Sequence, residues 1–236
     1  YSCDNCGKEE FELDENEGIK DEIKKNDEYK IEDLEEQKFD NRKKTYKVII
    51  IGNSSVGKSC ISYRITKKQF DSRLPATISV DVSDYKVKVN DRVIQIQFWD
   101  SCGNDEFAKN TPNLFKNSCV AIIVYAINNR KSFEQISTWY NILSNFSFEC
   151  IKYLVGNKTD LERVVEKNEA EAFKEKYNFQ KYFETSAKTG SNIKELLENI
   201  IISLYEKYEK GTNENKRDVI SLKKEELIKI GKKKDK

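Results

Sequence analysis

The stretch YKVIIIGNSSVGKS, residues 46–59, joins two patterns that together decide the fold. Its first half is a continuous run of apolar, largely β-branched residues, which is typical of a strand buried on both faces. Its second half, Gly52–Ser59, fits the pattern G-x-x-x-x-G-K-[ST] and opens a helical stretch. A strand, this pattern and a helix in that order predict a phosphate-binding loop.

The loop Gly52–Ser59 has the chemistry that a phosphate chain requires. Its glycines let the backbone curl so that successive N–H groups face phosphate oxygens, and the following helix adds its positive N-terminal end. Lys58 supplies a point charge to the β- and γ-phosphates, and the Ser59 hydroxyl suits Mg²⁺, which prefers oxygen ligands. The expected backbone donors are Ser55, Val56, Gly57, Lys58, Ser59 and Cys60. The alternative, a Gly/Ser-rich turn that happens to contain a lysine, is disfavoured because motif and context agree.

Beyond the loop, strand-like and amphipathic helical stretches alternate along the chain. The predicted strands are 94–100, 120–127, 151–157 and 183–187, and the predicted helices are 58–67, 132–146, 167–177 and 192–208. Residues 84–89 and the strand at 94–100 are predicted to form an antiparallel hairpin at a sheet edge. The alternation predicts an α/β fold with a mostly parallel six-stranded sheet, one antiparallel edge strand and helices on both faces.

Composition divides the chain into three regions. Residues 1–44 are predicted to be an acidic, largely disordered extension with a weak helical stripe at Ile19, Ile23, Ile31 and Leu34. Residues 45–208 are predicted to form one domain, and residues 209–236 a basic tail. The 42 Lys and Arg against 41 Asp and Glu give a net charge of +1, so no global field favours nucleic acid. Scattered cysteines and the lack of a long apolar run favour a cytoplasmic protein.

A second motif, NKTD at 157–160, follows the predicted strand at 151–157. The Asp160 carboxylate can accept two hydrogen bonds from the N1–H and N2–H₂ edge of guanine, a pair of donors that adenine lacks. Asn157 is expected to tether this loop, and the stem of Lys158 to lie over the face of the base. In ETSAKTG, residues 184–190, the N–H of Ala187 is a candidate donor to the guanine O6.

These motifs occur in one order: the phosphate loop, PATIS around Thr77, WDSCG, NKTD and ETSAK. From about residue 45 to 208 the chain resembles the Ras superfamily of small GTPases, and most of all its Rab branch. The Rab features are ISVDV after Thr77, QIQFWD and the IVYAI strand. The resemblance implies a molecular switch that binds GTP or GDP with Mg²⁺ and hydrolyses GTP. It also implies that this switch works in vesicle trafficking.

The resemblance also assigns roles to single residues. Thr77 would close on Mg²⁺ and the γ-phosphate, and Asp100 would hold Mg²⁺ through water. Phe70 would pack edge-on against guanine, and Gly103 would offer its N–H to the γ-phosphate. Ser186 and Lys188 belong to the ETSAK motif beside Ala187 and are expected in the base site. The implied partners are effector, exchange-factor and GTPase-activating proteins that bind through the switch regions.

Several positions depart from the family pattern, and Asn104 matters most. The family places a glutamine there, which orients the attacking water. Asparagine keeps the amide but is one methylene shorter, and a misplacement near 1 Å costs about a hundredfold in rate. We therefore expect Asn104 to align water poorly and hydrolysis to be slow. The alternative is a nucleotide-holding interaction or structural protein with little GTPase activity.

Other departures concern partners and anchoring. Ser79 replaces a glycine of the Rab pattern, and Val82 and Leu114 replace aromatics of its effector surface, although Trp99 remains. Partner preference therefore does not carry over. The sequence as given ends in GKKKDK without a prenylation signal, so we expect membrane contact to be at most peripheral. Cys3 and Cys6 form a lone C-x-x-C, and zinc needs four ligands, so no metal is expected there.

Overall fold

The computed structural model describes residues 29–34 and 44–210, with the exception of 105, 107, 109 and 148. The chain divides into two units at residue 30, and every helix and strand described lies in the unit that begins at Ile31. Most of the predicted N-terminal extension, including Ile19, Ile23 and the Cys3–Cys6 pair, lies outside the described residues. The predicted basic tail, beyond residue 210, also lies outside them.

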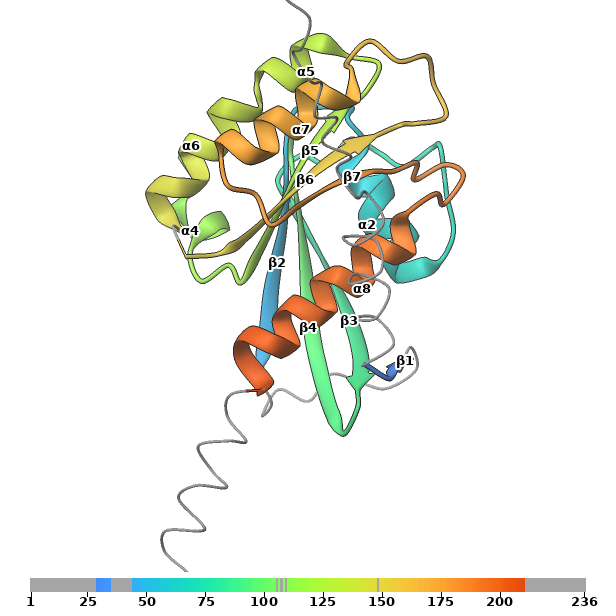
Figure 1. The fold of residues 1–236 in the computed structure, drawn as a ribbon, viewed down its shortest axis with the longest axis vertical. Helices are drawn as coiled ribbons and strands as arrows, with labels where there is room; N and C mark the ends of the chain where they lie inside the picture. Colours follow the sequence, from blue (N-terminus) through green and yellow to red (C-terminus); the bar gives the residue numbers. More distant parts are fainter. Residues whose placement is uncertain are drawn as a thin grey trace, which may run out of the picture. The chain divides into compact units, whose positions relative to one another are not determined.

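The described residues form one seven-stranded sheet in the order β1-β3-β4-β2-β5-β6-β7 (Figure 1). The parallel part consists of β4 (Arg92–Ser101), β2 (Thr45–Ile51), β5 (Val120–Ala126), β6 (Ile151–Asn157) and β7 (Lys181–Glu184). In register, Val48 lies opposite both Phe98 and Val120. β3 (Val80–Val89) runs antiparallel to β4 and forms the predicted hairpin with it. The predicted α/β class and mostly parallel sheet are confirmed.

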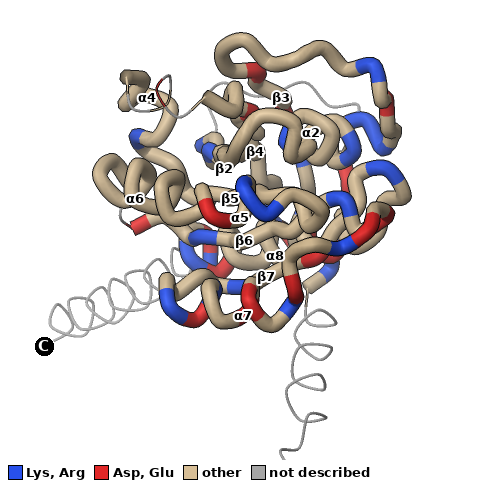
Figure 2. The backbone as a smooth tube through the Cα atoms, turned by 90° about the horizontal axis from the view of Figure 1, so that it is seen from above, with Lys and Arg blue, Asp and Glu red and all other residues tan. Residues whose placement is uncertain are grey.

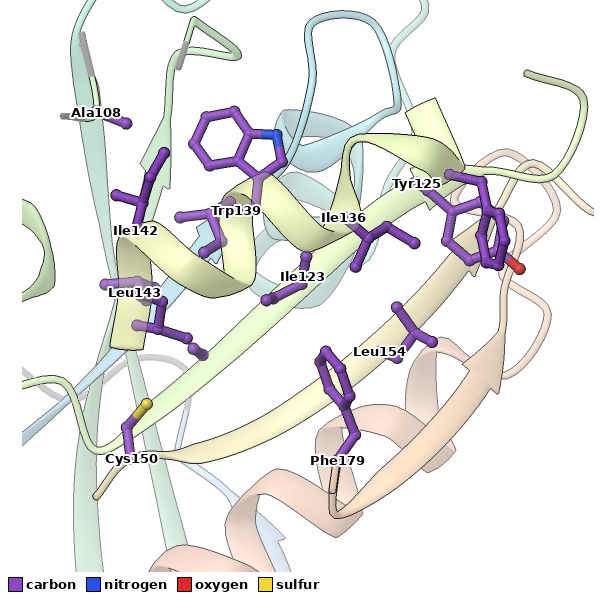
Figure 3. Packing of buried hydrophobic residues seen from close by; sticks show 14 of the residues in the cluster. Ala108, Ile123, Tyr125, Ile136, Trp139, Ile142, Leu143, Cys150, Leu154 and Phe179 are labelled. Atoms are coloured by element: carbon purple, nitrogen blue, oxygen red, sulfur yellow. The ribbon is translucent and has the colours of Figure 1, made fainter. Parts of the chain in front are cut away.

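The central strands are buried as their apolar runs predicted. Every residue of β5 is buried, and so are the last four residues of β2. Alternate side chains of these strands support helices on opposite faces of the sheet. On one face, Ile123 and Leu154 pack against α6 (Ile136–Phe146) through Ile136, Trp139 and Leu143 (Figure 3).

The opposite face of the sheet carries α8 (Ile193–Leu204). Tyr153, the neighbour of Leu154 in β6, donates its hydroxyl to the carbonyl of Asn199 at 3.0 Å. α2 (Lys58–Lys67) lies beside α8, whereas α5 (Arg130–Glu134) and α7 (Lys167–Lys176) lie near α6 (Figure 1). The short helix α4 (Pro112–Phe115) precedes β5, and a π-helical turn, Tyr205–Lys210, follows α8. In Figure 2, Lys and Arg are interspersed with Asp and Glu along α7 and the loops, whereas α4 and α6 carry none of these residues.

The sheet has one strand more than the six that were predicted. The extra strand is β1 (Ile31–Asp33), which pairs antiparallel with β3, Ile31 opposite Val89 and Asp33 opposite Val87. The predicted helical stripe is therefore wrong at Ile31 and Leu34. The edge of β3 presents N–H and C=O groups that a neighbouring strand can pair with, and Leu34 N–H bonds to the carbonyl of Lys86 at 3.0 Å. Pairing with β3 stabilises the three residues of β1 more than a helix would, because a helix this short does not nucleate.

Two predicted boundaries also differ from the structure. The predicted helix 132–146 is two helices, α5 and α6, which meet at Gln135. The predicted strand 183–187 pairs only as far as Glu184, so Thr185, Ser186 and Ala187 lie in a loop beyond the sheet. This loop lies at the same edge of the sheet as the residues that follow β2 and β6, because all three strands are parallel.

Candidate nucleotide site

The loop between β2 and α2 is held in a conformation that its glycines make possible. Gly52 has φ 137°, and a Cβ atom there would lie 2.1 Å from the carbonyl oxygen of Val124. Gly57 has φ 96°, and a Cβ atom there would lie 2.3 Å from Nδ2 of Asn157. A side chain at either position would therefore be strained and would clash with the neighbouring strand ends. Gly57 is also the N-cap of α2, and it offers no side-chain acceptor to the first N–H groups of that helix.

Lys58 is a buried cation at the start of α2. Its side chain is 5% exposed, and Nζ donates to the carbonyl of Asn53 at 2.9 Å. Burial lowers the pKa of Lys58 to about 8, although the nearby Asp100 carboxylate opposes the shift. A bound anion would stabilise the charged form of this side chain. The loop thus offers positive charge and a helix N-terminus at one place.

A cavity of about 520 Å³ opens beside the loop. Its lining brings together predicted residues from five separate segments: Ser55, Gly57, Lys58, Ser59, Cys60, Phe70, Thr77, Gly103, Asn157, Lys158, Asp160, Ala187 and Lys188. Within the described residues, Val56, Asp100, Ser186 and Asn104 are not part of that lining. Val56, Asp100 and Ser186 are instead buried behind it.

Three oxygen-bearing side chains meet next to Lys58. Ser59 Oγ lies 2.5 Å from Asp100 Oδ2 and 2.9 Å from Thr77 Oγ1, and Thr77 Oγ1 lies 3.1 Å from Asp100 Oδ2. Asp100 is 2% exposed, and among the described residues its Oδ1 has no hydrogen-bond partner. Burial raises the pKa of Asp100, whereas its bond from Ser59 and the charge of Lys58 lower it.

This oxygen cluster fits a hard cation. A buried, unpartnered carboxylate oxygen beside two hydroxyl groups is a donor set that Mg²⁺ accepts, with phosphate oxygens and water completing the octahedron. No three His, Cys, Asp or Glu side chains in the described part of the chain could hold a metal by themselves.

Asn157 ties the phosphate loop to the loop after β7. Its side chain is 1% exposed, and Nδ2 donates to the carbonyl of Val56 at 2.9 Å. Oδ1 accepts from Thr185 Oγ1 and from Ala187 N–H, each at 3.2 Å. Asn157 therefore joins the phosphate loop to the loop after β7. The Ala187 N–H that was assigned to guanine O6 donates to Asn157 in this structure.

Asp160 lines the same cavity. Its Oδ1 accepts from Ser186 Oγ at 2.6 Å, and its Oδ2 lies 3.9 Å from Lys188 Nζ. Ser186 is therefore a support for the carboxylate, which explains why it is buried rather than part of the lining. Lys158, which precedes the turn to Asp160, has φ 70° and lines the cavity.

Asn104 is exposed and shapes the turn after Gly103. Its Oδ1 accepts from the N–H of Glu106 at 2.9 Å. Gly103 itself approaches the phosphate loop so closely that a Cβ atom there would lie 2.0 Å from Ser54 N. The glycine therefore belongs to the cavity wall, whereas the asparagine next to it forms a local side-chain turn.

Sequence reasoning missed seven lining residues, namely Ser54, Ser72, Leu74, Pro75, Ala76, Ser101 and Leu161. Ser72 to Ala76 lie between Phe70 and Thr77, so two predicted residues bracket the segment that closes one side. Leu161 directly follows Asp160. The signal in each case was proximity in sequence to a predicted residue, because small and apolar side chains carry no chemical pattern of their own.

The comparison with known proteins agrees with this geometry. The sequence profile of the Ras family matches residues 47–206. The chain therefore belongs to the Ras family, and it is a small GTPase, a GTP hydrolase that works as a GTP-binding switch. It is 36% identical over 183 residues to Ras-related protein Rab-2B of Dictyostelium discoideum. The aligned part covers 74% of this chain and 90% of that protein. Ras-family GTPases bind GTP or GDP, generally with Mg²⁺.

The relationship to Rab proteins implies regulators and effectors as partners. No helix in the described part of the chain is long and apolar enough to cross a membrane.

Proposed function

We propose that the 520 Å³ cavity binds GTP or GDP with Mg²⁺, phosphates at Lys58 and guanine at Asp160. One observation carries the proposal: a single cavity is lined by a buried cation, by hydroxyl groups of the oxygen cluster and by a carboxylate that a neighbouring serine supports. The backbone N–H groups of Ser55 through Cys60 would surround the β-phosphate. Gly103 N–H, already close to the loop, would serve the γ-phosphate.

Mg²⁺ would be held by Ser59 and Thr77, with Asp100 contributing directly or through water. When bound, the ion neutralises charge between the β- and γ-phosphates. The chain's own part is to place these oxygens: Asp100 is next to the last residue of β4, Ser59 is the second residue of α2, and Thr77 comes from the loop before β3. Loss of the γ-phosphate would remove a partner of Thr77 and Gly103, and the two segments that carry them would then be free to rearrange.

At the base end, Asp160 would accept from both donors of the guanine edge, and Ser186 would hold its carboxylate in place. Phe70 and Lys158 line the cavity and would pack on the base and ribose. Ala187 N–H would donate to O6, shared with or released from Asn157 Oδ1. A carboxylate at this position selects against adenine, which offers no matching pair of donors.

Asn104 would orient the attacking water poorly, so GTP hydrolysis would be slow. Its amide lies outside the cavity lining and is engaged by Glu106 N–H. To reach the water, the amide would have to break that bond. It would also stop short of the position that a glutamine amide reaches, because asparagine has one methylene fewer. The same observation favours a second function, a nucleotide-holding interaction protein with little GTPase activity. The rate of a single turnover separates these two.

We also propose a role in vesicle trafficking, with peripheral contact to intracellular membranes, which rests on the relationship to Rab-2B. Effectors, an exchange factor and a GTPase-activating protein would read the segments beside the γ-phosphate. Ile78 is 91% exposed and Val82 43% exposed there, which provides apolar surface for a partner. Ile78→Asp should abolish capture of an effector by the GTP-loaded protein without changing nucleotide affinity.

The test of the proposed site is a titration of the purified protein with GDP, GTP, ADP and ATP, with and without Mg²⁺. The guanine nucleotides should bind at low-micromolar concentration or tighter, and Mg²⁺ should strengthen their binding. Adenine nucleotides should bind poorly. Equal affinity for GTP and ATP would refute the assignment of Asp160 to guanine. Guanine-nucleotide affinity that is the same with and without Mg²⁺ would refute the assignment of Ser59, Thr77 and Asp100 to the ion.

A further inference from the structure

The loop after β7 that contains residues 185–188 is called the base-site loop. Arg64 contacts this loop from the side opposite to the nucleotide cavity. It lies in α2, is half-buried, and donates from Nε to the carbonyl of Ala187 at 2.9 Å. Its Nη2 donates to the carbonyl of Lys188 at 2.5 Å. Arg64 lines a separate groove, with Gly190 and Ile193, whereas Ala187 and Lys188 line the nucleotide cavity. The loop therefore lies between the guanidinium and the cavity.

The two carbonyl contacts fix the orientation of two peptide planes. In a trans peptide, the C=O and the N–H of the same plane point in opposite directions. Because the Ala187 carbonyl faces Arg64, the N–H of Lys188 in that plane is directed away from Arg64. A planar guanidinium that donates along two directions holds such planes more firmly than one ammonium group can.

Asn157 holds the same loop from the other side through Ala187 N–H and Thr185 Oγ1. Arg64 Nη1 also reaches the carbonyl of Lys68 at 3.4 Å, where α2 ends and the segment toward Phe70 begins. One side chain thus joins the end of α2 to the loop that faces the purine O6. Gly190 lies beside the guanidinium without crowding it: a Cβ atom at Gly190 would lie 3.9 Å from Arg64 Cζ, which is an ordinary contact distance.

We propose that Arg64 is a positioning residue for guanine, which sets the peptide between Ala187 and Lys188 so that the Lys188 N–H faces O6. The inference rests on the proposed function of the cavity. Arg64 does not touch the nucleotide and acts through the two carbonyls. Its loss affects the recognition of O6 and leaves the phosphate and Mg²⁺ contacts in place.

The test compares wild type with Arg64→Met, Arg64→Lys and a control, Lys67→Met. Methionine keeps much of the apolar stem without a donor, lysine keeps one donor group, and Lys67 is an exposed residue of the same helix. Dissociation constants are measured at saturating Mg²⁺ for GDP and for 2-aminopurine riboside diphosphate, which lacks O6. Thermal unfolding of each variant with bound GDP checks that the fold persists.

Arg64→Met should weaken GDP about tenfold, which corresponds to about 1.4 kcal/mol, and weaken the nucleotide without O6 less than threefold. Arg64→Lys should fall between wild type and Arg64→Met, and Lys67→Met should match wild type. Equal losses for both nucleotides would show a merely structural role and overturn the inference, as would unchanged GDP binding. A wild-type protein that binds no guanine nucleotide would instead refute the proposed function itself, and this inference with it.

Discussion

Replacing Asn157 with leucine should break the link between the phosphate loop and the base-site loop. Leucine has the same branched arrangement of side-chain heavy atoms but no polar atoms, so the carbonyl of Val56, the hydroxyl of Thr185 and the N–H of Ala187 lose this partner. Thr185 is fully buried, and Val56 and Ala187 are nearly so. A buried polar group without a partner costs about 1–3 kcal/mol. Water from the adjacent cavity can satisfy part of this need, so we expect a loss of about 3–4 kcal/mol in the free energy of unfolding.

The assay is urea unfolding, followed by far-UV circular dichroism, together with the dissociation rate of a fluorescent GDP. Asn199→Leu is the matched control, because its amide bonds only to Glu195 of the same helix in the contacts that the structure describes. The control should lose less than about 0.5 kcal/mol. GDP should leave Asn157→Leu at least a hundredfold faster than wild type. A loss of stability below 1 kcal/mol with an unchanged dissociation rate would refute the reasoning.

Four further predictions concern other contacts of the described residues. Asp160→Asn should weaken GDP and gain affinity for xanthosine diphosphate, whose O2 accepts where guanine donates; titration with both nucleotides decides, and unchanged GDP affinity would contradict the base assignment. Asn104→Gln should speed single-turnover GTP hydrolysis by about ten- to a hundredfold, or about 1.4–2.8 kcal/mol in activation free energy, with unchanged affinity; an unchanged rate would make Asn104 a turn residue only. Asp33→Ala removes one partner of the Tyr85 hydroxyl and one of Lys68, 3.1 Å away, and should lower the free energy of unfolding by about 0.5–1 kcal/mol and speed hydrogen exchange at Leu34; protection equal to wild type would show that the β1 pairing does not depend on it. Burial favours a raised pKa for Glu184, but the two bonds from Arg163 bring it below its ordinary value, so its stabilising contribution is present above about pH 4.5 and lost as the pH falls further; Arg163→Met should flatten the fall in unfolding free energy between about pH 5 and 3, and an unaltered acid limb would be inconsistent with this pair.

The sequence predicted those parts of the fold whose physical cause is local. The apolar run before Gly52 had to be a buried strand, and the glycines at 52 and 57 mark positions where no other residue fits. The order of strands and helices then followed from their alternation. β1 could not be predicted in this way, because three residues in a charged segment form a strand only when the edge of β3 is beside them.

For the candidate site, the sequence identified the residues with chemical patterns and missed those that act by position. Lys58, Ser59 and Asp160 stand in motifs, and the structure brings them to one cavity. The contacts of Arg64 with Ala187 and Lys188 join residues more than a hundred positions apart, so no local pattern announces them. For Asn104 the sequence predicted poor alignment of the attacking water, and the structure adds a turn contact, in which its Oδ1 accepts from Glu106 N–H.

A guanine nucleotide in the cavity lined by Lys58 and Asp160 is the assignment on which the proposed function depends. Its most direct test is to purify the protein with Mg²⁺ present, denature it, and identify the released nucleotide by ion-exchange chromatography. The account predicts close to one equivalent of GDP and GTP together, with a share of GTP that rises if hydrolysis is slow. Release of ADP or ATP in place of guanine nucleotide would contradict it.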